Sequence, residues 1–137
     1  MGTRRRAREL ALQLLYQSEL TDSSPEEMQA GFEEWRNSTE VVQGFADGLL
    51  RGTLEYLPEI DEELVRQTTH WRLERLAAVD RNILRLAMYE LIYEEATPHA
   101  VVIDEAIEIA KKFGAKDSGR FVNGVLDGFV KRRAKAG

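Results

Sequence analysis

The 137-residue sequence contains no cysteine and only three prolines. The absence of cysteine excludes disulfide bonds and thiolate metal sites, which agrees with a protein of the reducing cytosol. Apolar runs are short, and none approaches the roughly 20 residues that a membrane-spanning helix needs. The two histidines, His70 and His99, have no acid or second histidine at metal-ligand spacing. We therefore expect a cytoplasmic protein without a metal, a cofactor or a membrane segment.

Motifs for nucleotide binding and for nucleophilic catalysis are also missing. The glycines form neither a GxGxxG nor a GxxxxGK[ST] loop, and no serine, threonine or tyrosine comes with a plausible base and orienting group. Adjacent carboxylates such as Glu26-Glu27 and Glu62-Glu63 point about 100° apart on a helix, which is typical of solvated faces. The sequence therefore indicates a binding protein rather than an enzyme.

Charges of opposite sign are separated along the chain. Residues 1–16 hold four arginines and one acid, and residues 111–137 hold eight basic groups and two acids, so these ends carry +3 and +6. The total of −5 leaves −14 for residues 17–110. Local clusters of arginine and lysine neutralise phosphate whatever the net charge of the molecule. Nucleic acid is therefore the first candidate ligand.

Apolar residues recur at three- and four-residue spacing along most of the chain, and no useful stretch alternates with period two. Thr3, Ser24, Thr39 and either Asp117 or Ser118 are suitable N-caps, and Gly114 is suited to end a helix in the left-handed conformation. We expect one all-α domain over residues 1–137, with six to seven helices. The pattern predicts them over about residues 3–20, 25–35, 39–57, 72–96, 98–113 and 118–135, with an additional turn or two over 60–67.

Four arginines at the start of the first predicted helix form one candidate site: Arg4, Arg5, Arg6 and Arg8. They lie where the helix dipole is positive and cations are mildly unfavourable, so another role should favour them there. Guanidinium groups bind phosphate with two hydrogen bonds and stack on unpaired bases. The alternative is a solvated basic tail that only aids solubility.

The connection between the last two predicted helices forms a second candidate site. It offers lysines for phosphate, aromatic rings for base stacking, a helix N-terminus for phosphate oxygens and a carboxylate for a base amino group. Because both phenylalanines also fall on apolar stripes, core packing is the alternative for them. The candidates are Lys111, Lys112, Phe113, Asp117, Ser118 and Phe121; the basic tail over 131–135 is a weaker one.

Three stretches resemble the signature segments of the NusB family. They are RRRARELALQLLY (residues 4–16), DRNILRLAMYEL (80–91) and PHAVVIDEAIEIAKKFG (98–114), which continues into DSGRFVNGVLD (117–127). The resemblance implies two three-helix bundles packed across each other. It also implies a bacterial antitermination factor that pairs with the ribosomal protein NusE, binds boxA RNA of nascent ribosomal transcripts, and acts with RNA polymerase and other Nus factors.

Carried over by position, the resemblance implies RNA contacts for both candidate sites and NusE contacts for Tyr16, Asp80 and Arg81. At Gly119-Arg120 the sequence departs from the residues that many relatives carry. The free protein is compatible with either a monomer or a homodimer.

Two alternative functions stay open. One is a fragment of a ribosomal RNA cytosine methyltransferase, although a chain ending at Gly137 leaves no room for its cofactor-binding domain. The other is a helical adaptor without RNA affinity.

Overall fold

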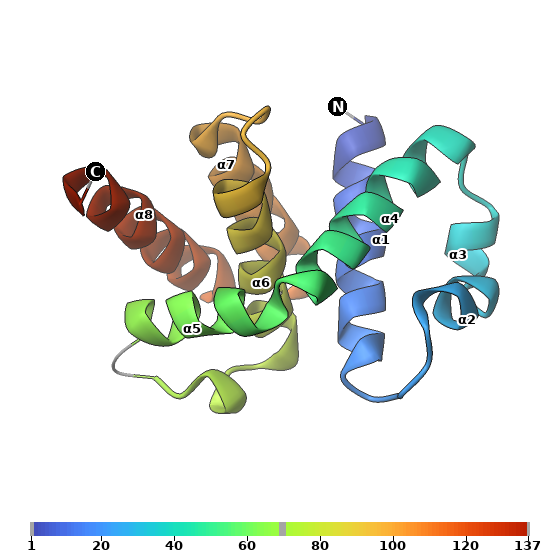
Figure 1. Cartoon of the computed structure of the whole chain (residues 1–137), viewed down its shortest axis with the longest axis horizontal. Helices are drawn as coiled ribbons and strands as arrows, with labels where there is room; N and C mark the ends of the chain where they lie inside the picture. The colour runs from blue at the N-terminus through green and yellow to red at the C-terminus, as the bar shows by residue number, and fades with distance from the viewer. Residues whose placement is uncertain (1, 69–70, 137) are drawn as a thin grey trace.

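The computed structural model describes residues 2–68 and 71–136, which form eight α-helices and one 3-10 helix and contain no strand (Figure 1). The predicted all-α class is therefore confirmed. Within the same residues, no helix combines the length and apolarity needed to cross a membrane. The helices are α1 (Gly2–Ser18), α2 (Pro25–Ala30), α3 (Glu33–Arg36), α4 (Glu40–Glu55), α5 (Leu57–Gln67), η1 (Leu73–Arg75), α6 (Ala78–Tyr93), α7 (His99–Phe113) and α8 (Ser118–Ala136).

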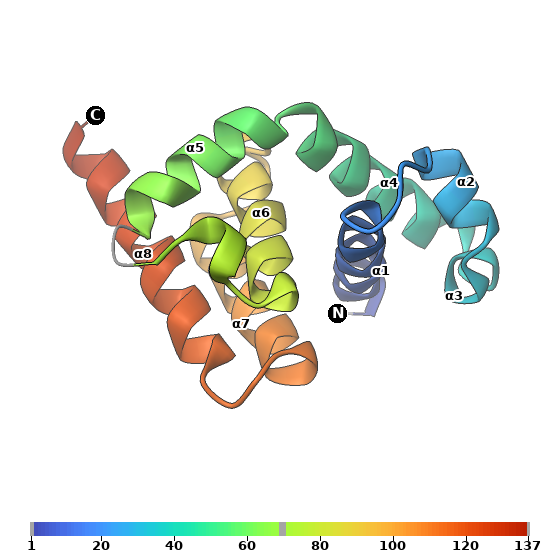
Figure 2. The same ribbon diagram turned by 90° about the horizontal axis from the view of Figure 1, so that it is seen from below.

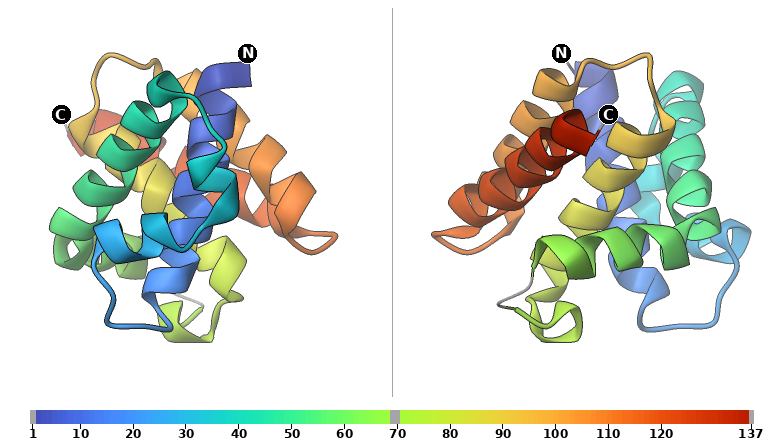
Figure 3. Two further views of the ribbon diagram at one scale, coloured as in Figure 1. Left: turned by 90° about the vertical axis from the view of Figure 1, so that its right-hand side faces the viewer. Right: turned by 60° about the vertical axis from the view of Figure 1, so that its left-hand side comes forward.

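The helices form two groups that meet along α6. Helix α1 packs against α4, with α2 and α3 beyond them, while α5, α7 and α8 surround α6 (Figure 1). Contacts of α6 with both α1 and α4 join the groups. Figure 3 shows that α1 begins at the same end of the molecule as the connection between α6 and α7.

Local hydrogen bonds explain where the short helices begin. The Glu27 N–H donates to Ser24 Oγ at 3.1 Å and the Ser24 N–H donates to the Glu27 carboxylate at 2.8 Å, which is a capping box in front of α2. Thr39 caps α4 in the same way, because its Oγ1 accepts from the Val42 N–H at 3.3 Å. The single helix predicted over 25–35 is divided at Gly31 and Phe32 into α2 and α3.

Other helix boundaries also differ from the predicted ones. The helix predicted over 72–96 begins only at Ala78, because residues 73–75 form the 3-10 helix η1. The segment over 60–67 is part of the eleven-residue helix α5, with Pro58 in its first turn. Thr3 lies inside α1 and does not cap it.

Gly114 ends α7 in an extended conformation, with φ −94° and ψ −171°, so the left-handed conformation predicted for it is wrong. The need for glycine comes from close packing instead. An added Cβ would lie 2.5 Å from Ser118 Oγ and 2.8 Å from the Ala110 carbonyl oxygen. Gly114 thus allows α8 to begin directly against the end of α7.

The core lies around α6, whose Leu84 and Met88 are fully buried. Leu14 and Leu15 of α1 enter the same cluster, while Ala7 and Leu10 pack with α4 in a smaller one. Full burial of one such leucine contributes roughly 1.5–3 kcal/mol. The two clusters hold α1 with one side on α4 and the other side toward α6 and α7, where the candidate site lies.

Candidate nucleic-acid interface

The first arginines of α1 extend toward two different helices. The Arg4 guanidinium is exposed and lies 4.2 Å from the centre of the Phe45 ring on α4. Arg5 extends to the other side and donates to both carboxylate oxygens of Glu105 on α7, at 2.9 and 2.6 Å. These hydrogen bonds hold the pKa of Glu105 below its usual range. The predicted basic arm is therefore an ordered part of α1.

Arg8 is buried between α1 and α6. Its side chain keeps 6% of its accessible surface and donates two hydrogen bonds of 2.8 Å to Glu90, whose side chain keeps 5%. Burial alone would lower the pKa of Arg8, but the hydrogen bonds to Glu90 and the attraction of its charge raise it. This placement differs from the RNA contact expected for Arg8, because the guanidinium faces a carboxylate inside the protein and holds α1 to α6.

Exposed cations alternate with carboxylates where α1 faces α7. Lys112 Nζ lies 3.1 Å from a carboxylate oxygen of Glu9, which also accepts from Arg6 at 3.3 Å. Lys111 pairs with Glu108 of its own helix at 3.3 Å. We call the surface made by Arg5, Arg6, Glu9, Glu105 and Lys112 the α1–α7 face. The side chains of Arg5, Arg6 and Lys112 keep 34%, 39% and 58% of their accessible surface, so a phosphate can reach these cations, whereas the Glu9 carboxylate is buried.

The connection between α7 and α8 is shaped by Ser118. This side chain is buried, and its Oγ accepts from the Ala115 N–H at 2.9 Å, while Asp117 beside it is exposed. Of the two predicted residues, only Asp117 therefore presents its side chain to solvent. Ser118 contributes by fixing the turn that begins α8.

Phe113 and Phe121 both pack against the core and both remain half-buried. The Lys112 ammonium lies 5.3 Å from the centre of the Phe113 ring. Phe121 meets the ring of Trp71 nearly edge-on, with the ring centres 5.9 Å apart and an angle of 75° between the planes. Core packing and an accessible aromatic surface thus occur together in the same residues.

Two further cations belong to this region although the predicted site omits them. Lys116 and Arg120 are exposed, and over the residues that the structure covers no carboxylate lies within 4 Å of either. Their position in the basic segment over 111–121 was a signal that could have found them. Glu9 and Glu105, the acids that pair with the predicted cations, had no such signal because their partners lie on another helix.

Tyr16, Asp80 and Arg81 lie where the end of α1 meets the start of α6. Tyr16 is 42% exposed and lines a hollow of about 430 Å³ together with Val79 and Phe113. One oxygen of Asp80 is buried and has no hydrogen-bond partner in the part of the chain that the structure describes. Of the predicted NusE residues, Tyr16 therefore adjoins Phe113 of the predicted RNA site.

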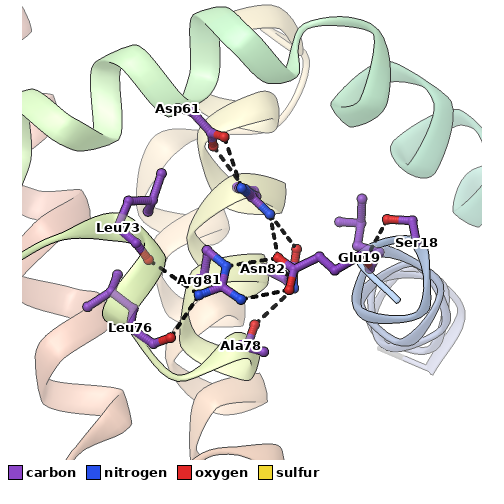
Figure 4. A network of polar contacts seen from close by, with 10 residues as sticks. Ser18, Glu19, Asp61, Leu73, Leu76, Ala78, Arg81 and Asn82 are labelled. Atoms are coloured by element: carbon purple, nitrogen blue, oxygen red, sulfur yellow. Dashed lines mark hydrogen bonds and ion pairs between the residues drawn. The ribbon is translucent and has the colours of Figure 1, made fainter. Parts of the chain in front are cut away.

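Arg81 belongs to a polar network that joins three helices (Figure 4). It donates to Glu19 at 2.8 and 2.6 Å and to the Leu76 carbonyl at 2.8 Å. Arg85 connects Glu19 to Asp61 of α5, at 2.6 and 2.8 Å. The hydrogen bonds from Arg81 are the main reason that the pKa of Glu19 lies below its usual range. Arg81 thus holds α1 to α6, and any partner would meet it inside this network.

Among residues 2–68 and 71–136, no three histidine, aspartate or glutamate side chains are arranged to hold a metal ion. His70 lies outside those residues. The fold and the site together define an all-helical protein with exposed cations and aromatic edges along α1, α7 and the start of α8.

The model of the NusB family matches residues 5–131, and the chain belongs to this family. The chain is 46% identical over 127 residues to the transcription antitermination protein NusB of Trichlorobacter lovleyi, which covers 93% of this chain and 89% of the relative.

Two solved structures are similar over nearly the whole chain. T. maritima NusB has a TM-score of 0.83 and 42% sequence identity, and the match covers 93% of this chain and 90% of that one. A NusB from a crystal structure of the antitermination factors NusB and NusE in complex with double-stranded RNA has a TM-score of 0.85 and 29% identity. That match covers 96% of this chain and 98% of the other.

Proposed function

We propose that this protein is a bacterial transcription antitermination factor that binds boxA RNA of nascent ribosomal RNA transcripts together with NusE. It acts as a single cytoplasmic RNA-binding domain over residues 1–137, by binding rather than by catalysis. In this role it supports processive transcription by RNA polymerase with the other Nus factors. Membership of the NusB family supports the proposal, as does similarity to a NusB crystallised with NusE and RNA.

The observation that carries the proposal is the α1–α7 face and its continuation into Phe113 and Phe121. Arg5 and Arg6 of α1 lie beside Lys112 of α7, and all three cations remain accessible although Glu9, which pairs with two of them, is buried. A phosphate that contacts the accessible side of these cations releases counterions of the RNA. The half-exposed rings at the end of this face are suited to stacking with unpaired bases.

NusE would bind beside this RNA surface. Tyr16, Val79 and Phe113 line one apolar hollow, so a protein that occupies it would lie next to an RNA base stacked on Phe113. The strongly acidic middle of the chain suits a basic ribosomal protein. RNA and NusE are therefore expected to strengthen each other's binding.

The first experiment is a fluorescence-anisotropy titration with boxA RNA and a scrambled RNA of equal length, each with and without NusE. The double variant Arg5→Glu, Arg6→Glu is compared with Arg36→Glu, Arg66→Glu, which makes the same change in net charge on α3 and α5. Loss of two phosphate contacts should weaken both RNAs and reduce the salt slope by about 1.4, at about 0.7 per single-stranded contact. The control double variant should keep the parent's affinity and slope.

Tighter binding of boxA that NusE strengthens is the result expected for the parent protein. Equal affinity for both RNAs, unchanged by NusE, would indicate that the α1–α7 face is a general polyanion site. Absence of RNA binding in the parent would instead favour the helical adaptor.

A further inference from the structure

Trp71 is the largest exposed aromatic side chain near the proposed RNA surface. It lies between α5 and η1 and is 60% exposed, although its ring touches Phe121 edge-on. Tryptophan is seldom left this exposed, because its indole is the largest apolar surface that a side chain can bury. The edge-on contact orients the indole and leaves most of its surface open to solvent.

Packing of α5 beside α8 determines the position of Trp71 (Figure 2). Arg132 of α8 pairs with Glu63 of α5 at 2.8 Å. Nearer the start of α8, a Cβ added at Gly128 would lie 3.4 Å from the side-chain oxygen of Gln67. The second half of α5 therefore crosses α8, and Trp71, four residues beyond the end of α5, meets Phe121 in the first turn of α8.

The charges beside the two rings are positive. Arg72 follows Trp71 and Arg120 precedes Phe121; both are exposed, and no carboxylate of residues 2–68 and 71–136 lies within 4 Å of either. The acid closest in sequence to Trp71, Glu74, lines the separate hollow between α1, α5 and α6, whereas Asp117, one turn before Phe121, is exposed. Phosphate is a suitable ligand for two such arginines.

We propose that Trp71 and Phe121 form a second base-stacking platform, which extends the RNA surface from the α7–α8 connection onto the end of α5. An unpaired base stacks on the indole, while Arg72 and Arg120 contact the adjoining phosphates. The inference rests on the proposed RNA-binding function and adds a site beyond the α1–α7 face. Nucleic acid is favoured over a protein partner because Phe121 belongs to the predicted RNA site, and because neither arginine beside the rings is neutralised by a carboxylate of the described residues.

Fluorescence of the indole tests this directly. The chain has two tryptophans, so Trp35→Phe leaves Trp71 as the sole tryptophan reporter. Titration with boxA RNA should quench the emission of Trp71, and the midpoint of this quenching should equal the midpoint of the anisotropy titration.

Substitutions provide the second measurement. Trp71→Ala should weaken boxA binding by about 5- to 150-fold, the range expected for one stacked base, and Trp71→Phe should restore most of the loss. Val41→Ala is the matched control, because Val41 on α4 is 61% exposed and should leave the affinity unchanged. Thermal unfolding of each variant separates lost stacking from lost folding.

Unchanged affinity of Trp71→Ala together with unquenched emission would overturn the platform while leaving the proposed function intact. A Trp71→Ala variant that binds RNA normally but loses NusE binding or self-association would assign the indole to a protein contact instead. Failure of the parent to bind any RNA would contradict the proposed function itself.

Discussion

Replacement of Arg8 by methionine should destabilise the fold without removing an RNA contact. The change keeps an unbranched side chain in the space beside Glu90 but removes two buried hydrogen bonds of 2.8 Å. Glu90 would then remain as a buried carboxylate that has lost its guanidinium partner. The perturbation therefore acts on the junction between α1 and α6.

Removing one partner of a buried ion pair typically costs about 3–5 kcal/mol. That is a large fraction of the roughly 5–15 kcal/mol by which a domain is stable. Replacing both charges should cost far less, because no unpaired charge is left inside. We expect Arg8→Met with Glu90→Leu to recover at least about 2 kcal/mol relative to Arg8→Met alone.

Urea unfolding of the parent, the two single variants and the double variant gives the coupling energy of the pair. RNA affinity is then measured for the folded double variant at two salt concentrations. The expected salt slope equals the parent's slope, because the buried guanidinium of Arg8 faces Glu90 and not solvent. An Arg8→Met variant that kept its stability but lost RNA affinity would refute the structural role and restore Arg8 to the RNA site.

Three other predictions concern packing, pH and the turn before α8. Gly52→Ala should lower the free energy of unfolding in urea by about 1–3 kcal/mol, because the added Cβ would lie within 2.5 Å of the Tyr89 ring. Gly48→Ala, where the added Cβ meets open space, should raise it by up to about 1 kcal/mol. Because the pKa of Glu19 is lower in the folded protein, its ionised carboxylate stabilises the fold at pH values above the ordinary glutamate pKa of about 4.3, and this stabilisation is lost as pH falls through the lower folded pKa. Glu19→Gln should therefore lower the free energy of unfolding at pH 7 and reduce the loss of stability between neutral and acidic pH. Ser118→Ala should cost about 1–3 kcal/mol in urea unfolding by leaving the Ala115 N–H without its acceptor, with Lys116→Ala in the same connection as the exposed control.

Local patterns were sufficient for the helices and for several of their ends. Ser24 and Thr39 cap α2 and α4 through hydrogen bonds that reach only three residues along the chain, so the residue types alone predict them. The apolar spacing likewise predicts α7 and α8, because one helical face must be buried. The resemblance of three segments to the NusB family supplied what periodicity cannot, namely the ligand and the partner expected of the fold.

Tertiary packing decided whether each predicted site residue is buried or exposed. Four neighbouring arginines look equivalent in the sequence, yet Arg8 is buried against Glu90, 82 residues away, while Arg5 pairs at the surface with Glu105, 100 residues away. Trp71 carries no local signal and gains its place only because α5 packs beside α8. The sequence by itself determined helix positions and the basic ends, since these depend on near neighbours. Which cations face solvent depends on contacts between distant segments, and only the folded chain decided it.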